Sequence, residues 1–387
     1  MPTTLEVHPW PDPVIDTLGH DPRSAYAEIF WLPTLGPTSL LLLRRLATQR
    51  DPRLAAAAEH ARRTLMLTEA LRAQRLVVPE PPASPAGTVA LEPATPHRLV
   101  HDARHGTRLP GERVRGEGEP RTRDAAADEA YDAAGATFAC LEQAFGRDSI
   151  DGHGMTLVST VHFGERYDNA FWNGRQMVYG DGDGVVFNGF TSCLDVVGHE
   201  FAHGVTQHEA ALEYRGESGA LNESFSDVLG SIVKQHALGQ RVDEADWLIG
   251  AGLFTPLVHG VAIRSMRAPG TAYDDPRLGR DPQVAHMRDY VHTFEDQGGV
   301  HLNSGIPNHA FYLAARALGG HVWERAGVVW YAALCMRLHA RSTFADAAAA
   351  TLAEADEHFG ATAAEQVRGA WAAVGVTPTA GEVTRAA

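Results

Sequence analysis

The chain has 387 residues, a formal net charge of −15 and a hydrophobic content of 44%. This length allows two or three domains, and this composition is typical of a folded globular protein. The excess of acidic residues argues against a nucleic-acid partner, which would favour a basic surface. Three cysteines, an odd and small number, do not make a disulfide framework.

Residues 1–36 form an N-terminal extension to which the sequence assigns no fold and no chemistry. They are rich in proline and contain Trp10 and Trp31. A small ordered cap and a module for localisation or pairing are both compatible with them. Met1 to Arg23 lacks a basic start followed by an apolar core, so no Sec signal peptide is visible. We therefore expect a protein that is extracellular by a leaderless route or cytoplasmic.

Residues 37–76 are predicted to form two short helices, since apolar residues recur at helical spacing from Arg53 to Arg75. Residues 40–76 contain eight arginines and only three acidic residues. Such a segment could dock on the acidic remainder as an intramolecular prosegment, or could be a solvated basic helix. Residues 77–96 are rich in proline and small residues and are predicted to be an exposed linker. We expect a processing cut near Pro82 to Ala90.

Residues 97–205 are predicted to form an N-terminal α/β lobe. Arg98 to Arg115 alternates apolar and polar residues, which predicts a hairpin around His105 and Gly106. A helix is expected at Ala125 to Phe145 and a strand at Thr156 to His162. Two further strands, Asn169 to Gly174 and Gln176 to Tyr179, are predicted to have an exposed edge. Such an edge can bind an extended peptide through its backbone.

The centre of the chain is the HExxH sequence from His199 to His203. Residues four apart on an α-helix are separated by only ~40° around its axis, so both imidazoles can bind one metal ion from one face. Histidine nitrogen suits Zn²⁺, and a catalytic zinc site has three protein ligands and an open position for water. Glu200 lies beside the first ligand, where its carboxylate can take a proton from that water.

A second helix, expected from Ala220 to Gln235, supplies a candidate third ligand, Glu223. Asp227 lies one turn later on the same face and could accept a hydrogen bond from the outer nitrogen of a ligand histidine. The alternative is that these are ordinary charges on solvated helix faces. The alternative is disfavoured by the apolar face of the HExxH helix, which consists of Val196, Val197, Phe201 and Val205.

Residues 206–377 are predicted to form a mainly helical C-terminal lobe, and residues 378–387 a polar tail. A tight turn is expected at Gly298 and Gly299, just before His301. Strand signals before the HExxH helix and helical signals after it predict two lobes, with this helix between them at the floor of a cleft. The helices expected after the turn are Asn303 to Leu318, Ala326 to His339, Thr343 to His358 and Ala361 to Ala373.

These motifs together resemble the thermolysin-like zinc endopeptidases. The resemblance rests on HExxH, on ESGALNESFSD with its glutamate twenty residues after the second histidine, and on NAFWNG, MVYGDGDG and GGVHLNSG. It extends from about Arg98 to about Val376. Residues 64–72 are similar to the prosegment of the short, protealysin-like branch. The implied fold is an α+β, two-lobed zincin of the gluzincin type, with a β-rich N-terminal lobe, a mainly α-helical C-terminal lobe and a small helical prosegment.

The resemblance implies one catalytic zinc ion bound by His199, His203 and Glu223. Asn222 and Asp227 would then support the zinc ligands from outside.

The resemblance also implies that Glu200 is the general base and proton shuttle. Tyr214 and His301 would donate hydrogen bonds to the oxyanion of the tetrahedral intermediate, and Asp296 would orient His301. Considered without the resemblance, an arginine in a loop-rich stretch is more simply the partner of a local acid. By resemblance, the residues that hold the substrate backbone are Asn169, Ala170 and Arg264.

The chain differs from larger family members at a double calcium site beside the zinc helix. Asp195 is present, but Lys234 stands where the family has a glutamate. An ammonium group there would repel Ca²⁺ and could pair with Asp195. We therefore expect that the double calcium site is lost. The stretch Asp181 to Gly184 lacks the spacing of an EF-hand loop and is predicted to be a tight turn.

The resemblance implies an endopeptidase that cleaves before bulky hydrophobic residues and is made as a self-processing precursor. Its expected partners are peptide or protein substrates and its own prosegment in cis. We expect a monomer without nucleic-acid or membrane partners. A different zinc hydrolase sharing only HExxH is disfavoured by the Glu223 spacing and by GGVHLNSG. A latent zinc-binding precursor or regulatory protein-binding module, kept inactive by residues 1–76, remains an open alternative.

Overall fold

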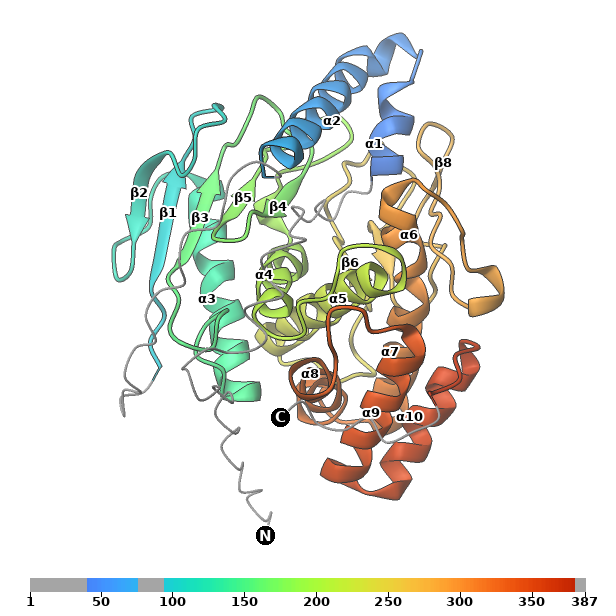
Figure 1. Ribbon diagram of the computed structural model, residues 1–387. Helices are drawn as coiled ribbons and strands as arrows, with labels where there is room; N and C mark the ends of the chain where they lie inside the picture. Colours follow the sequence, from blue (N-terminus) through green and yellow to red (C-terminus); the bar gives the residue numbers. More distant parts are fainter. Residues whose placement is uncertain (1–39, 76–93, 380–387) are drawn as a thin grey trace.

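The computed structural model describes residues 40–75 and 94–379, and Figure 1 shows their arrangement. The predictions made for residues 1–36, for the processing site at Pro82 to Ala90 and for the end of the tail lie outside the described residues. Among the described helices, none has both the length and the apolar composition needed to cross a lipid bilayer.

A five-stranded sheet forms the N-terminal lobe, in the strand order β2-β1-β3-β5-β4. Strands β1, β3 and β5 run parallel, and the two edge strands β2 and β4 are antiparallel to their neighbours. The predicted hairpin is confirmed by the β1–β2 pair. Strand β4 is an edge strand as expected, but its three residues are all buried. The strands are β1 (Arg98–Asp102), β2 (Glu112–Gly116), β3 (Leu157–Val161), β4 (Ala170–Trp172) and β5 (Met177–Tyr179).

Helix α3 (Ala125–Phe145) covers one face of this sheet (Figure 1). Asp124 caps the start of the helix by accepting hydrogen bonds from the backbone N–H groups of Ala126 and Ala127. Gly146 ends the helix in the left-handed conformation, with φ 63°. The helix expected from Ala125 to Phe145 is therefore confirmed with the same bounds.

Two helices, α4 (Leu194–His208) and α5 (Gly216–Leu238), pack against each other in the middle of the molecule, between the sheet and the C-terminal helices (Figure 1). A Cβ atom at Gly230 would overlap the carbonyl oxygen of Asp195. Only glycine therefore permits the close approach of the two backbones at this point. Buried side chains on the two facing surfaces can then reach one another directly.

The C-terminal lobe consists mainly of helices packed around α5. The loop-rich stretch between α5 and α6 contains two short antiparallel strand pairs. They are β6 (Leu248–Ile249) with β7 (Arg264–Ser265) and β8 (Asp274–Asp275) with β9 (Gly279–Arg280). The helices are α6 (Asp296–Asn303), α7 (Gly305–Leu318), α8 (Ala326–Met336), α9 (Phe344–Phe359) and α10 (Ala361–Ala373), with 3-10 turns η3 (Phe190–Ser192), η4 (Met287–Asp289) and η5 (Val322–Glu324).

Some predicted boundaries differ from the structure. The helix expected from Asn303 begins at Gly305, and the helix expected to end at His339 ends at Met336, where the next residue has φ −132°. Thr343 is the N-cap of α9 rather than its first residue, because its side chain accepts a hydrogen bond from the backbone N–H of Asp346.

The N-terminal segment folds as α1 (Leu40–Ala47), the 3-10 turn η2 (Pro52–Leu54) and α2 (Ala55–Arg75). The prediction of two short helices was wrong for the second, which has 21 residues. Leu43 and Leu46 of α1 are fully buried, so this segment is packed on the rest of the protein. In Figure 1 the two helices (blue) lie across one end of the molecule, α2 near β4 and β5 and α1 near α6 and β8.

Candidate active site

Two histidines of α4 and one glutamate of α5 converge in the centre of the molecule. His199, His203 and Glu223 are each no more than 1% exposed. The Nε2 atoms of the two histidines lie 3.1 Å apart. Each is 3.5 Å from a carboxylate oxygen of Glu223. The two helices therefore bring three potential metal ligands to one point.

The outer nitrogens of both histidines have fixed partners. Nδ1 of His199 donates to Asp227 Oδ1 at 2.8 Å. Nδ1 of His203 lies 2.7 Å from Asn222 Oδ1 and 2.9 Å from Ser226 Oγ. Because the proton of each ring is on Nδ1, the lone pairs of both Nε2 atoms face the same space. Two lone pairs 3.1 Å apart repel each other, so a proton or a metal cation has to lie between them.

The donor set fits a zinc ion. In a tetrahedral site with Zn–N bonds of about 2.0–2.1 Å, ligand atoms are separated by roughly 3.4 Å, close to the three separations found here. Glu200 Oε1 and Glu223 Oε2 are buried carboxylate oxygens without a hydrogen-bond partner in the described part of the chain. Ligand atoms of His199, Glu200 and His203 all lie within 4.8 Å of one another. A metal ion satisfies these groups, whereas an empty apolar cavity does not.

Glu200 is held against the edge strand of the sheet. Its Oε2 accepts a hydrogen bond of 3.0 Å from the backbone N–H of Trp172 in β4, and its Oε1 lies 4.0 Å from His199 Nε2. Burial raises the pKa of Glu200 to about 8. A carboxyl group with a raised pKa can both accept and return a proton near neutral pH.

A network around Asp227 fixes the orientation of His199. Asp227 accepts hydrogen bonds from Arg264 at 2.8 and 2.6 Å and from Asn308 Nδ2 at 2.8 Å. Although burial opposes ionisation, the guanidinium of Arg264 and the ring of His199 lower the pKa of Asp227 to about 2. Arg264 thus pairs with a buried acid, as expected for this residue without the resemblance.

Tyr214 and His301 lie on the other side of Glu223. The hydroxyl of Tyr214 donates a short hydrogen bond to Glu223 Oε1 and lies 3.4 Å from His301 Nε2. Nδ1 of His301 is bonded to Asp296 Oδ1 at 2.7 Å, and the backbone N–H of His301 donates to Asp296 Oδ2 at 2.9 Å. Although burial would lower it, the carboxylate of Asp296 raises the pKa of His301.

The predicted turn before His301 is confirmed. Asp296, Gln297, Gly298 and Gly299 all have positive φ, from 51° to 93°. This left-handed run reverses the chain, so the side chain of Asp296 can bind the backbone and the ring of His301 together. Gly298 and Gly299 adopt positive φ without the steric cost that a Cβ atom would add, which lowers the free-energy cost of this run.

Asn169 immediately precedes β4, the edge strand, and Ala170 is its first residue. The carbonyl oxygen of Asn169 accepts a hydrogen bond of 2.9 Å from Gly180 N, and Ala170 is paired with Tyr179 of β5. Both are fully buried. These substrate-binding residues suggested by the sequence thus lie in or directly before the strand that also anchors Glu200 through Trp172.

Helix α2 contacts the segments around this site. Leu65 packs against Tyr214 and Val300. The backbone N–H of Asp168 donates to Thr64 Oγ1 at 3.0 Å, and the hydroxyls of Thr68 and Tyr167 lie 2.8 Å apart. Further along the helix, Leu67 and Leu71 pack on a hydrophobic cluster of Phe163, Tyr167, Phe171 and Val178. The N-terminal segment therefore covers part of the region between the two lobes.

Comparison with known families identifies this arrangement. Residues 95–207 match the model of the thermolysin metallopeptidase catalytic domain, and residues 210–376 match that of the thermolysin metallopeptidase alpha-helical domain. An extracellular metalloprotease from Pectobacterium carotovorum is 52% identical over 318 residues, which cover 82% of this chain and 90% of that protein. This chain belongs to the thermolysin family. It is a metallopeptidase, and the two-lobed α+β fold expected from the sequence is confirmed.

Similar proteins also cover more of this chain than the two matched domains do. The solved structure of the precursor of protealysin, a metalloproteinase from Serratia proteamaculans, is similar with a TM-score of 0.79 and 48% identity. The similarity covers 88% of this chain and 99% of that one. Protease PrtS from Photorhabdus is 48% identical over 285 residues, 73% of this chain and 77% of that protein. These relatives favour a zinc endopeptidase made as a self-processing precursor over a permanently latent module or an unrelated zinc hydrolase.

Lys234 of α5 reaches Asp195 of α4, the pairing expected from the sequence. Its ammonium group donates to Asp195 Oδ2 at 2.8 Å, to Asp246 Oδ1 at 2.9 Å and to the carbonyl oxygen of Leu248 at 2.8 Å. The expected ion pair with Asp195 is therefore present. Its nitrogen has three oxygen acceptors, which are the ligand type that Ca²⁺ requires.

Three contributors to the site were missed by sequence reasoning: Ser226, Asn308 and the backbone N–H of Trp172. Ser226 lies one turn after Asn222, and helical spacing on α5 could have indicated it. Asn308 comes from α7 and Trp172 from β4, and no local pattern places either near α4.

Proposed function

We propose that His199, His203 and Glu223 bind the catalytic zinc ion of this metallopeptidase. The observation that carries the proposal is the convergence of the two Nε2 atoms on the Glu223 carboxylate while both outer nitrogens have fixed partners. Asn222 and Asp227, aided by Ser226, keep the imidazole rings in the orientation that metal binding needs.

When bound, zinc polarises the scissile carbonyl and lowers the pKa of a bound water. Glu200 takes the proton of the attacking water and delivers it to the leaving amine. Its bond to Trp172 N keeps one carboxylate oxygen fixed while the other acts. Tyr214 and His301 stabilise the oxyanion that develops on the carbonyl, and Asp296 orients His301 and favours its charged form.

The substrate binds as an additional strand beside β4, with Asn169, Ala170 and Arg264 contributing to its backbone binding. The place of β4 at the edge of the sheet supports this proposal, because strand addition recognises backbone rather than sequence. Cleavage before bulky hydrophobic residues rests on the resemblance to the thermolysin family.

In the precursor, α1 and α2 act as the prosegment in cis. They contact both lobes: Arg45 donates to the carbonyl oxygen of Leu278, and Thr64 and Thr68 bind the segment before β4. Ion pairs of Arg44 with Glu295 at 3.6 Å and of Arg63 with Glu165 at 3.4 Å support docking by charge, but all four side chains are about half exposed or more. Hydrophobic packing therefore contributes more than charge to prosegment binding.

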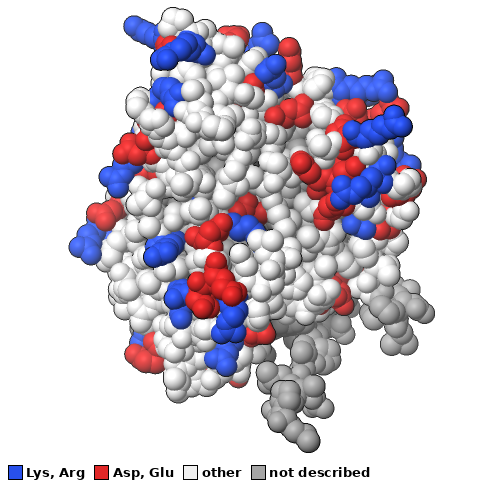
Figure 2. Space-filling view, turned by 180° about the vertical axis from the view of Figure 1, so that it is seen from behind, with Lys and Arg blue, Asp and Glu red and all other residues white. Residues whose placement is uncertain are grey.

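We further propose that the zinc ion is the one catalytic metal and that the double calcium site is lost, since Lys234 binds the carboxylate of Asp195. In this proposal the protein is a monomer that acts on peptides outside the cell and has no nucleic-acid or membrane partner. The names of relatives support the location, and the mixed acidic and basic side chains on the face seen in Figure 2 support the absence of a nucleic-acid partner.

The proposal is tested with Glu200→Gln, compared with wild type and with the control Glu324→Gln in η5. Hydrolysis of an internally quenched peptide with a leucine after the scissile bond and zinc content by elemental analysis are measured together. We expect loss of hydrolysis by at least ~100-fold with zinc retained in Glu200→Gln, and wild-type behaviour in the control. Unchanged hydrolysis in Glu200→Gln would exclude the assigned base.

A further inference from the structure

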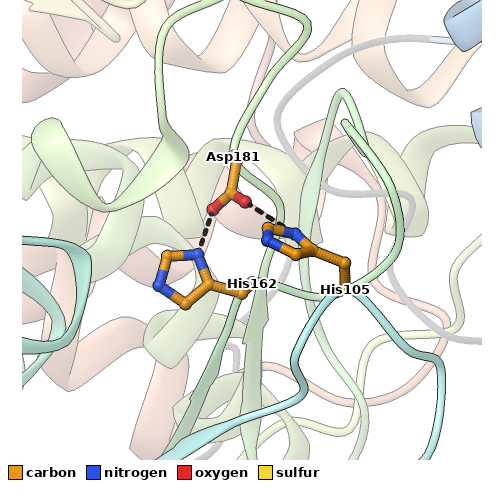
Figure 3. Close-up of side chains that lie close together, drawn as sticks. All are labelled: His105, His162 and Asp181. Atoms are coloured by element: carbon orange, nitrogen blue, oxygen red, sulfur yellow. Dashed lines mark hydrogen bonds and ion pairs between the residues drawn. The ribbon is translucent and has the colours of Figure 1, made fainter. Parts of the chain in front are cut away.

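A second cluster of metal-ligating side chains lies at the end of the sheet in the N-terminal lobe. Figure 3 shows His105 from the β1–β2 loop, His162 directly after β3 and Asp181 just after β5, with both rings directed at the carboxylate. Nδ1 of His162 is 2.8 Å from Asp181 Oδ1, and Nδ1 of His105 is 3.3 Å from Asp181 Oδ2. Because β1, β3 and β5 are parallel, their carboxyl ends meet at one edge and bring these residues together.

The other nitrogen of His162 already has a partner. Nε2 lies 2.7 Å from Asp124 Oδ2, and Oδ1 of the same carboxylate caps α3. Asp124 is therefore held in place by its contact with the helix, and its carboxylate accepts a hydrogen bond from the Nε2–H of His162. This is the arrangement in which a carboxylate behind a histidine orients the ring and makes its remaining nitrogen a better metal ligand.

The backbone around the two histidines is fixed as well. His105 N donates to the carbonyl oxygen of His162 at 2.8 Å, and Gly164 N donates to that of Gly106 at 2.8 Å. His105 and His162 both have left-handed backbone conformations, with φ 58° and 55°. Such conformations cost free energy in residues other than glycine, so both ring positions are maintained by their surroundings rather than by local preference.

We propose that His105, His162 and Asp181 bind a divalent transition-metal ion such as Zn²⁺, at a site separate from the HExxH helix. Two imidazole nitrogens and one carboxylate favour Zn²⁺, Cu²⁺ or Ni²⁺ over Ca²⁺ or Mg²⁺. The three ligand atoms lie within 4.8 Å of one another. The 3.3 Å separation suits tetrahedral zinc, and the 2.8 Å separation needs to open by about 0.5 Å when a metal replaces the shared proton.

The site is open to solution on one side, because the His105 side chain is 60% exposed while that of His162 is 20% exposed. Water therefore completes the coordination, and the ion can exchange more readily than one at the buried HExxH site. A bound ion links the β1–β2 loop to the ends of β3 and β5. Its effect is to stabilise this end of the sheet.

The test uses full-length protein carrying Glu200→Gln, which prevents self-processing. This parent, two variants of it (His105→Ala and Asp181→Asn) and a control with the exposed His259→Ala are dialysed to equilibrium against one buffer of the same fixed free Zn²⁺ concentration. Bound zinc is counted by elemental analysis, and the melting temperature is recorded with and without zinc. We expect one ion fewer in His105→Ala and Asp181→Asn than in the parent and the control, with a smaller zinc-dependent rise in melting temperature.

The same number of ions in His105→Ala, Asp181→Asn and the parent would overturn the proposal and assign the cluster to a shared proton. Because His105 is an exposed side chain in a loop, its replacement keeps the fold, and near-ultraviolet circular dichroism confirms this. The comparison counts the ion lost relative to the parent, so its result stands whether or not the HExxH site is filled. Loss of an ion from the His259→Ala control as well would show that the zinc binds to surface histidines in general.

Discussion

Two threonines of α2 provide a direct test of how the prosegment binds. Thr64 Oγ1 accepts a hydrogen bond from Asp168 N, and the hydroxyl of Thr68 is bonded to that of Tyr167. Thr64 is 1% exposed and Thr68 is 6% exposed, so water cannot replace the lost partners while α2 is docked. The double substitution Thr64→Val and Thr68→Val removes both bonds and changes the size of the side chains little.

The magnitude follows from the two bonds. Each lost hydrogen bond weakens the docked state by about 1 kcal/mol, because its partner is solvated only when α2 leaves the surface. Two bonds therefore amount to about 2 kcal/mol, and since 1.4 kcal/mol is a factor of ten, the undocked population should rise about 30-fold.

Hydrogen exchange of the α2 backbone amides measures this population in full-length protein carrying Glu200→Gln. We expect exchange in α2 to become about 30-fold faster, while exchange in α4 and α5 stays as it was. The control is Thr48→Val, an exposed residue whose hydroxyl bonds to the nearby Arg45 carbonyl oxygen within the same segment. Unchanged α2 exchange in the double variant, or equal acceleration in every helix, would refute the assigned docking contacts.

Three further predictions concern the body of the enzyme. Asp227→Asn should lower zinc affinity by roughly 10- to 100-fold in a chelator competition, because His199 loses its anionic partner; Asp243→Asn on the surface should change nothing. Burial and the nearby Asp183 raise the pKa of Asp168 well above its ordinary value, so ionised Asp168 destabilises the fold as pH rises above about 4. Asp168→Asn should therefore melt about 2–4 °C higher than the same protein without this substitution at pH 8, and at the same temperature at pH 4. Equal melting temperatures of the two proteins at both pH values would refute this. Because the ammonium of Lys234 binds Asp195, millimolar Ca²⁺ should leave the melting temperature of full-length protein carrying Glu200→Gln unchanged. A large rise in this melting temperature would contradict the loss of the calcium site.

The sequence predicted those parts of the site that depend on helical spacing. HExxH places His199 and His203 on one face, and Glu223 and Asp227 are one turn apart on the facing helix. Both pairs meet as expected because Gly230 lets α4 and α5 approach closely. Local periodicity and the resemblance to the thermolysin family were sufficient for this part.

Residues that arrive through tertiary packing could not be predicted in this way. Asn308 reaches Asp227 from α7, and Trp172 reaches Glu200 from an edge strand through its backbone. His105, His162 and Asp181 are far apart in the chain, and only the parallel order of β1, β3 and β5 brings them together. Helical spacing from Arg53 to Arg75 did locate α2 (Ala55–Arg75), whose residues are mostly strong helix formers, although the helix is not short.

The most direct test of the central claim is the intact mass of purified full-length protein over time, with zinc content, for wild type beside Glu200→Ala. We predict that wild type loses roughly ninety N-terminal residues, an estimate from the exposed proline-rich linker, whereas Glu200→Ala keeps its zinc and stays intact. If both proteins bind zinc and both remain whole, Glu200 does not drive self-processing, and the account of a self-maturing zinc endopeptidase is contradicted.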